Sequence, residues 1–490
     1  MMSDSISTRA IRVQPGIGWE LHRLPGVRNG VDLFVAASLL ALVSFSLPGR
    51  EVPDSASSLD SIALIKVAIR IGVVAWFGIL LVQEIYAQVL DRVARGNDSP
   101  ANYLFTLKWT SPILVPWMAY AGWSFLSLLW TPLKSVSAGQ WLGLAAMLLF
   151  AQIIYMRTSG KSRSSESTGL SQDPTALPWQ LIISQIGWVL FFYSLFVLVI
   201  HLIAPQHSGL DRDIFQKGND GFVQPTAAGA TASLGLVLAV VMLSLRGLKG
   251  QTWLVATCLV HAPVLIFSVS RAALAAAALC ILLSCTLLLG RQVRGLLIAA
   301  IGLVMLVAIL IDPGFELLGK ALQGTSQYVQ RGQTSAQLRA VSGRAEMWEA
   351  IWKEIAKSPV VGHGYFVTSE SGQFLMWGSR ANHDAHHVFL QVLVTTGLIG
   401  ALLFSWAMLV AVYRLIRLLW RTPHGSNGRN LGWLLLILGV WYLGWGQGCT
   451  TFVGPIRPES VLFFASLGLL AAATAAGPET SRAELRGCQL

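Results

Sequence analysis

Charged side chains are scarce in this chain of 490 residues, because Asp, Glu, Lys and Arg together make up 12% of it. Soluble domains use roughly 25%, and a soluble protein of this length needs that charge to cover its surface. Hydrophobic residues make up 54%, and the mean hydropathy is +0.60. These figures argue against a soluble multidomain enzyme, a disordered chain or a small disulfide scaffold, and they favour a polytopic membrane protein.

Cysteine is also rare, with five residues in the chain. No cysteine forms a CxxC pair that a second such pair could complete, so a zinc site has no support. Several lie inside apolar stretches, where a thiol usually serves as a small core residue. We therefore expect no disulfide framework.

The net charge is +11 and the pI is about 9.7, a balance that nucleic-acid-binding proteins also show. Here most basic residues sit beside apolar stretches, and no basic patch is interleaved with aromatic residues. We expect membrane lipids, and no nucleic acid, as partners.

Apolar stretches of the length that a membrane span needs recur along the chain. The sequence therefore predicts an all-α polytopic membrane protein with about twelve transmembrane helices. The predicted stretches are 31–48, 62–82, 112–130, 138–155, 179–204, 227–245, 251–269, 272–290, 295–311, 387–412, 431–450 and 458–476.

The distribution of Lys and Arg between alternate loops predicts the orientation. One set of loops, which includes both termini, carries 20 basic residues; the other carries 13, of which seven lie in one long loop that counts little in this rule. Both termini are therefore expected in the cytoplasm, and the first apolar stretch is interpreted as an anchor and not as a cleaved signal peptide. The predicted parts are a cytoplasmic arm (1–30), helices one to nine (31–311), a large periplasmic loop (312–386), helices ten to twelve (387–476) and a cytoplasmic tail (477–490).

The loop 312–386 is too long for a simple connection, and loops of this size usually carry function. Within it, Trp348, Ile351, Trp352 and Ile355 recur at helical spacing and predict an amphipathic helix that Pro359 ends. The loop is therefore expected to be partly helical.

Arg271 ends the short segment Ser268–Arg271 between two predicted spans. A guanidinium there has to face water, a headgroup or an anion. One interpretation is an interfacial anchor; the other is a phosphate clamp, because arginine presents a planar fork to phosphate oxygens.

Three of the nine histidines, His383, His386 and His387, cluster where the chain re-enters the membrane. A metal cluster, interfacial histidines without special role, and a general base at the membrane surface are the three interpretations. The last rests on neutral imidazole, which can accept a proton from a hydroxyl near neutral pH.

Lys66 and Arg70 lie four residues apart inside an apolar stretch. Charges inside a membrane are costly and usually face a cavity or a partner. They either line a path for a phosphate group or extend toward one membrane face.

The order of several motifs resembles the O-antigen ligase and O-antigen polymerase family of bacterial envelope glycosyltransferases. The motifs are Ser-x-Ser-Arg at 268–271, then Arg344 and Trp348 followed by Pro359 and the Gly-His-Gly-Tyr run 362–365, and then His386 with Gly397-Leu-Ile-Gly400 downstream. His387 stands where the family has a small polar residue such as Asn. The resemblance covers roughly 205–412.

The resemblance implies a GT-C-like fold and transfer of a glycan from an undecaprenyl-pyrophosphate carrier to an acceptor hydroxyl, without metal or other cofactor. By the family match, Arg271 and Arg344 stabilise the leaving pyrophosphate and His386 deprotonates the acceptor. Five further residues are expected to contact substrate: Arg212, Lys217, Arg380, His383 and His387. Asp211 and Asp213 form a D-x-D pair, which leaves a metal-bound alternative open.

The resemblance favours an O-antigen ligase of the bacterial inner membrane, with lipid A-core as acceptor and the active site on the periplasmic side. A polymerase that extends O-antigen or exopolysaccharide repeats, and a protein O-glycosyltransferase, remain alternatives within the family. The alternative of another class is a transporter or lipid-glycan flippase, which often has two similar halves; the sequence has no internal repeat.

Overall fold

The computed structural model describes most of the helical part of the chain. The described residues are 31–42, 61–94, 110–159, 179–208, 210, 222–246, 251–268, 270–289, 344–366, 370–371, 374–375, 385–450, 453 and 456–475.

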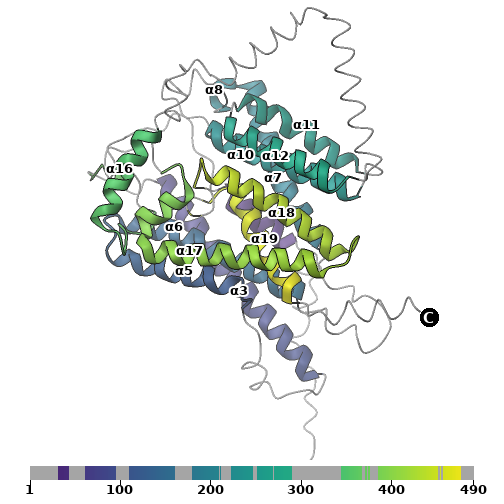
Figure 1. Ribbon diagram of the computed structural model, residues 1–490, viewed down its shortest axis with the longest axis horizontal. Helices are drawn as coiled ribbons and strands as arrows, with labels where there is room; N and C mark the ends of the chain where they lie inside the picture. The colour runs from purple at the N-terminus through teal and green to yellow at the C-terminus, as the bar shows by residue number, and fades with distance from the viewer. Residues whose placement is uncertain are drawn as a thin grey trace, which may run out of the picture.

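Helices make up nearly all of this part (Figure 1). In chain order they are α2 (Val31–Leu42), α3 (Ser61–Ala94), α5 (Leu114–Leu126), the short 3₁₀ helix η3 (Ser127–Leu129), α6 (Lys134–Ser159), α7 (Trp179–Ile203), α8 (Pro205–Ser208), α10 (Pro225–Arg246), α11 (Thr252–Phe267), α12 (Arg271–Leu287), α16 (Arg344–Lys357), α17 (Val388–Arg421), α18 (Asn427–Gly446) and α19 (Pro458–Ala475). A two-residue antiparallel hairpin, β1 (Glu370–Ser371) with β2 (Phe374–Leu375), lies between α16 and α17.

Helices occupy the predicted apolar stretches, apart from 295–311, which lies outside the described residues. Two of them, α3 and α17, have 34 residues each and extend well past the predicted ends. Among the described residues, 6 helices are long and apolar enough to cross a membrane: α3, α6, α7, α10, α17 and α19. The chain is thus a helical membrane protein of several spans, and the number twelve and the orientation remain predictions.

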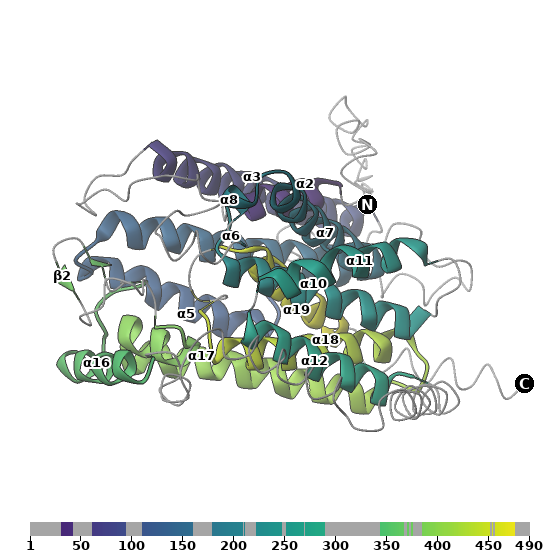
Figure 2. The ribbon, with the colours of Figure 1, turned by 90° about the horizontal axis from the view of Figure 1, so that it is seen from above.

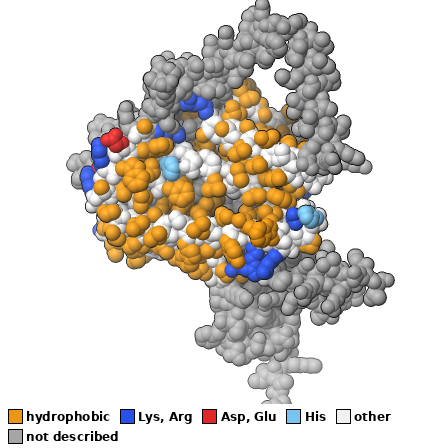
Figure 3. Space-filling view, viewed as in Figure 1, with side chains coloured by type: hydrophobic (Ala, Val, Ile, Leu, Met, Phe, Trp, Pro, Cys, Tyr) orange, Lys and Arg blue, Asp and Glu red, His pale blue; other side chains and the backbone are white. Residues whose placement is uncertain are grey.

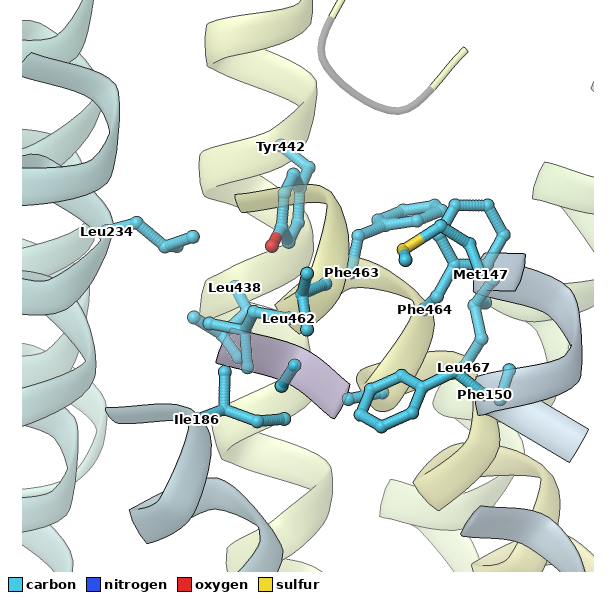
Figure 4. Close-up of a cluster of buried hydrophobic side chains, with 14 of the residues drawn as sticks. Met147, Phe150, Ile186, Leu234, Leu438, Tyr442, Leu462, Phe463, Phe464 and Leu467 are labelled. Carbon is cyan, nitrogen blue, oxygen red and sulfur yellow. The ribbon is translucent and has the colours of Figure 1, made fainter. Parts of the chain in front are cut away.

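The core of the bundle forms around α19, which packs against α6, α7, α17 and α18. Phe463 and Phe464 of α19 lie at its centre, with Tyr442 of α18 on one side and Met147 of α6 on the other (Figure 4). The rings of Tyr442 and Phe463 meet edge to face with centroids 5.0 Å apart, a favoured aromatic geometry. Dense aromatic packing of this kind holds the helix ends that carry the polar residues described below.

The outer face of the bundle is apolar. Figure 3 shows hydrophobic side chains across most of the visible face, with basic side chains gathered toward its margins. On α17, Leu402, Leu409 and Trp420 are 61%, 68% and 85% exposed. An apolar belt of this extent is expected of a surface that faces lipid.

Helix α16 lies at one end of the bundle, alongside the first half of α17 (Figures 1 and 2). The predicted amphipathic helix is therefore present, but the prediction that Trp352 belongs to its buried apolar stripe is wrong. Ile351 and Ile355 are buried as expected, whereas Trp352 is 54% exposed and Met347 takes its place against α17. The reason is that the helix is rotated so that its 347–351–355 face, and not its 348–352 face, points fully inward.

Candidate functional site

The turn that carries Arg271 is held by two buried serines. The hydroxyl of Ser268 donates to the carbonyl of Leu265 (2.7 Å) at the end of α11, and the backbone N–H of Ser270 donates to Ser268 Oγ (3.4 Å). A Cβ atom on Gly229 of α10 would overlap Ser268 Oγ and lie 2.7 Å from Ser270 Cβ. The serines of the Ser-x-Ser-Arg motif thus build a tight turn, and the turn presents Arg271 as the first residue of α12.

The long helix α17 is broken at Gly397, which has φ 66° and ψ −169°. A break of this kind frees backbone groups that need new partners. The loop 358–366 supplies them on one side: Leu398 N donates to Pro359 O (2.8 Å) and Ile399 N donates to Val360 O (3.3 Å). The loop 358–366 is therefore docked on the kink of α17 by backbone hydrogen bonds.

The same loop also donates to the carbonyls that the break leaves open. His363 N donates to Val394 O (3.1 Å), and Gly364 N donates to Thr395 O (2.8 Å). Close approach of the two backbones requires glycine at 362, because a Cβ there would lie 2.5 Å from Gly397 N, and its φ of 69° is in the left-handed region. Two parts of the motif pattern that lie more than thirty residues apart in the sequence thus meet here.

Helix α16 is tied to this unit at both ends. Near its end, His363 Nε2 donates to the carbonyl of Glu354 (2.9 Å). Near its beginning, Trp348 Nε1 donates to the carbonyl of Ala385 (3.0 Å), whose N–H in turn donates to Gln391 Oε1 of α17 (2.8 Å). These bonds fix the first residue of α16, Arg344, relative to the start of α17.

The two histidines before α17 have different surroundings. His386 has a left-handed backbone with φ 46°, a conformation that costs energy outside glycine and gathers at functional sites. His387 is the N-cap of α17, and its Nδ1 accepts from Leu390 N (3.4 Å). Its ring also hydrogen-bonds to the side chain of Gln447. The ring of His387 thus caps the start of α17.

Burial lowers the pKa of His387 below its ordinary 6.5, and the hydrogen bond to Gln447 offsets part of this shift. The neutral ring is the form that can accept from Leu390 N. His387 therefore serves the helix cap in its neutral state.

The end of α18 brings the separate elements together. A Cβ atom on Gly448 would lie 3.2 Å from Nη1 of Arg344 and 3.7 Å from Cβ of Ala272, the neighbour of Arg271. The preceding residue, Gln447, contacts His387. Arg344, the start of α12 and the start of α17 therefore all border residues 447–448. The distances between the Arg271, Arg344 and His386 tips, about 10 Å in our expectation, remain a prediction.

Arg457 is a basic residue at this place that sequence reasoning did not single out. Its Nη1 lies 3.4 Å from Sγ of Cys449, the residue after Gly448. The available signal was its position, since it is the single basic residue of the predicted outward segment 448–457. No motif marked it.

Comparison with protein-family models finds one that matches residues 254–405 and is described as O-antigen ligase. Residues 254–405 are therefore similar to the O-antigen ligase family. It contains Arg271, Arg344 and His386, while Gly448 and Arg457 lie beyond its end. A search of curated proteins finds no match.

The site at the end of α18 is electropositive. Helices α12, α16 and α17 all begin at it, and helix N-termini carry partial positive charge and amide donors. Arg271 and Arg344 stand at two of these N-termini, where a cation is unfavourable unless an anion balances it. Ser270, the N-cap of α12, makes no side-chain capping bond. The arrangement is suited to an anionic ligand with several acceptor oxygens.

A metal centre finds no support within the described ranges, where no group of three His, Cys, Asp or Glu side chains lies close enough to hold an ion. The D-x-D pair Asp211 and Asp213 lies outside the described residues, as do Arg212, Lys217, Arg380 and His383. Their predicted roles in substrate binding remain predictions.

Proposed function

We propose that the chain transfers a glycan from an undecaprenyl-pyrophosphate carrier to an acceptor hydroxyl, at the outer face of the bacterial inner membrane. The observation that carries the proposal is the meeting of Arg344, the Arg271 turn and the His386–His387 segment at the end of α18. All but the end of α18 belong to the segment that matches the O-antigen ligase family.

In this reaction the acceptor oxygen forms a bond to the anomeric carbon of the donor sugar. The bond between that carbon and the pyrophosphate oxygen breaks, and the electron pair leaves with the lipid pyrophosphate. Arg271 and Arg344 stabilise the negative charge that develops on it, and prearranged donors of this kind are among the largest contributions to catalysis. No metal is needed for this step, since the arginines supply the charge.

His386 receives the proton of the acceptor hydroxyl. Two observations favour it over its neighbour. Its left-handed backbone is a conformation that a functional site retains at a cost, and Nδ1 of His387 serves as the acceptor that caps α17. The family's Asn at the position of His387 fits the same reasoning, because Asn is a strong N-cap.

The preferred acceptor is lipid A-core, which makes the protein an O-antigen ligase; a growing polysaccharide, which makes it a polymerase, is the second candidate. The test uses the purified full chain in liposomes with a lipid-pyrophosphate glycan and either acceptor. Glycosylated lipid A-core supports the ligase, and longer lipid-linked glycans support the polymerase. Movement of the donor across the bilayer without a new glycosidic bond would overturn both in favour of a flippase.

A further inference from the structure

Arg70 is an arginine buried inside the bundle. It lies within the α3 span 64–89 and is 7% exposed. Its guanidinium rests on α6, where Nη1 donates to the carbonyl of Gly139 (2.7 Å). Cβ atoms on Gly139 and Gly143 would lie 3.6 Å from Nη1 and 4.0 Å from Nε. The guanidinium thus lies against α6 between Gly139 and Gly143.

Arg157, another buried arginine of the bundle, has acidic partners. Arg157 is 8% exposed, and Asp32 receives two hydrogen bonds from it, at 3.0 and 2.7 Å, while Glu84 lies 3.8 Å away. Among the described residues no carboxylate pairs with Arg70. An intramembrane charge without a counter-charge is expensive and usually marks a ligand or ion path.

Two buried hydrogen-bond donors at Arg70 lack a partner among the described residues. Its own Nε is buried and makes no hydrogen bond in the described part of the chain, and the same holds for the hydroxyl of Tyr365. Tyr365 is 1% exposed and lies within electrostatic range of Arg70. A buried polar group left unpaired costs about 1–3 kcal/mol, so two together indicate a ligand that accepts from both.

Tyr365 is placed by the loop that docks on the α17 kink. Its N–H donates to Ser127 Oγ (2.8 Å), and a Cβ atom on Gly364 would overlap Thr131. These contacts fix the backbone of Tyr365 against Ser127 and Thr131.

We propose that Arg70 and Tyr365 form a binding site for the phosphate group of a lipid. Phosphate matches the arginine fork and has oxygens left for the tyrosine hydroxyl. Arg70 lies six residues into its span, which is about 9 Å along a helix, so a ligand with its own hydrocarbon chain reaches it more readily than a free ion. Lys66, half-buried one turn nearer the start of α3, lies on the same helix face.

Native mass spectrometry of the purified full chain tests this site with a short-chain polyprenyl phosphate, phosphatidylglycerol and inorganic phosphate as separate probes. Tyr365→Phe should weaken lipid-phosphate binding about fivefold, the value of one hydrogen bond near 1 kcal/mol. Arg70→Gln should weaken it more. Tyr413→Phe, at a tyrosine 60% exposed on α17, is the matched control and should change nothing.

The melting temperature without added lipid separates a ligand site from a structural one. Tyr365→Phe removes a buried hydroxyl that makes no hydrogen bond in the described part of the chain, so the lipid-free variant should be as stable as the wild type or more stable. A lower melting temperature with unchanged binding would overturn the site, as would equal binding of polyprenol, which lacks phosphate. Preference for polyprenyl phosphate identifies the carrier lipid as the ligand, and preference for phosphatidylglycerol identifies a membrane lipid; either supports the site. The outcome does not depend on whether the chain transfers glycans.

Discussion

The docking of loop 358–366 on the kink at Gly397 predicts that Gly397→Ala disrupts the site from a distance. With φ at 66°, an added Cβ is strained, and it would also overlap the carbonyl of Val360. A backbone with φ 66° and ψ −169° is essentially restricted to glycine, and it costs about 1–3 kcal/mol for a residue with a Cβ. Moving Val360 away also loses the bonds from Leu398 N and Ile399 N, at about 1 kcal/mol each.

The expected cost is therefore on the order of 3–5 kcal/mol, which shifts the balance between docked and undocked loop by more than roughly a hundredfold. Hydrogen exchange measured by mass spectrometry reports this balance through the backbone amides that the docking protects. Peptides that contain His363, Gly364, Leu398 and Ile399 should exchange faster by about that factor. Because α16 is tied to the same loop through His363, transfer activity should fall as well.

Gly439→Ala on α18 is the control, since no atom lies within 4 Å of a Cβ at that position. It should leave both exchange and activity unchanged. If Gly397→Ala exchanged like the wild type over 359–366 and kept its activity, the loop and the kink would not support the site.

Three further results are expected. Gly448→Ala should lower the transfer rate by about ten- to a hundredfold, because the added Cβ displaces Arg344. The melting temperature should not fall, because only a flexible side-chain tip has to move. Gly444→Ala is the control, and a normal transfer rate in Gly448→Ala would contradict the assignment of Arg344. Since the folded pKa of His387 lies below 6.5, the contribution of His387 to stability is present above about pH 6.5 and is lost as the pH falls through the lowered pKa. Thermal melts of His387→Asn should lack this pH-dependent loss of stability, and a pH profile identical to that of the wild type would refute the prediction. Transfer should survive EDTA, and loss that magnesium or manganese restores would point back to the D-x-D pair.

Several features of the fold and site were readable from the sequence because they rest on local patterns. Apolar stretches of span length predicted the helices, and helical spacing in an otherwise polar loop predicted α16. Arg271 stood out because a charged side chain between two adjoining spans has to face water, a lipid headgroup or an anion. The exposure of Trp352 was not readable, since the rotation of α16 depends on its packing against α17.

The long-range parts of the site were beyond sequence reasoning. The pairing of Gly362 with Gly397 is a contact between two backbones, and glycine spacing alone does not say which partner each will meet. Gly448 matters only because Arg344 lies against it, and Arg457 belongs to no motif. The sequence marked Arg70 as a costly charge inside a span. It does not predict that Tyr365, whose hydroxyl has no hydrogen-bond partner among the described residues, lies near it from a loop almost three hundred residues further along the chain.

The most direct test of the account compares His386→Asn with His387→Asn in the transfer assay with purified protein, lipid-pyrophosphate glycan and acceptor. Asn tolerates the left-handed backbone at position 386, so that variant should fold and bind donor while its transfer rate falls about 10²–10⁴-fold, as expected for loss of a general base. His387→Asn restores a strong N-cap and should have nearly full activity, and His383→Ala should lose much less than His386→Asn. An active His386→Asn variant together with an inactive His387→Asn variant would contradict the assignment, and equally small losses at all three histidines would contradict the general-base mechanism itself.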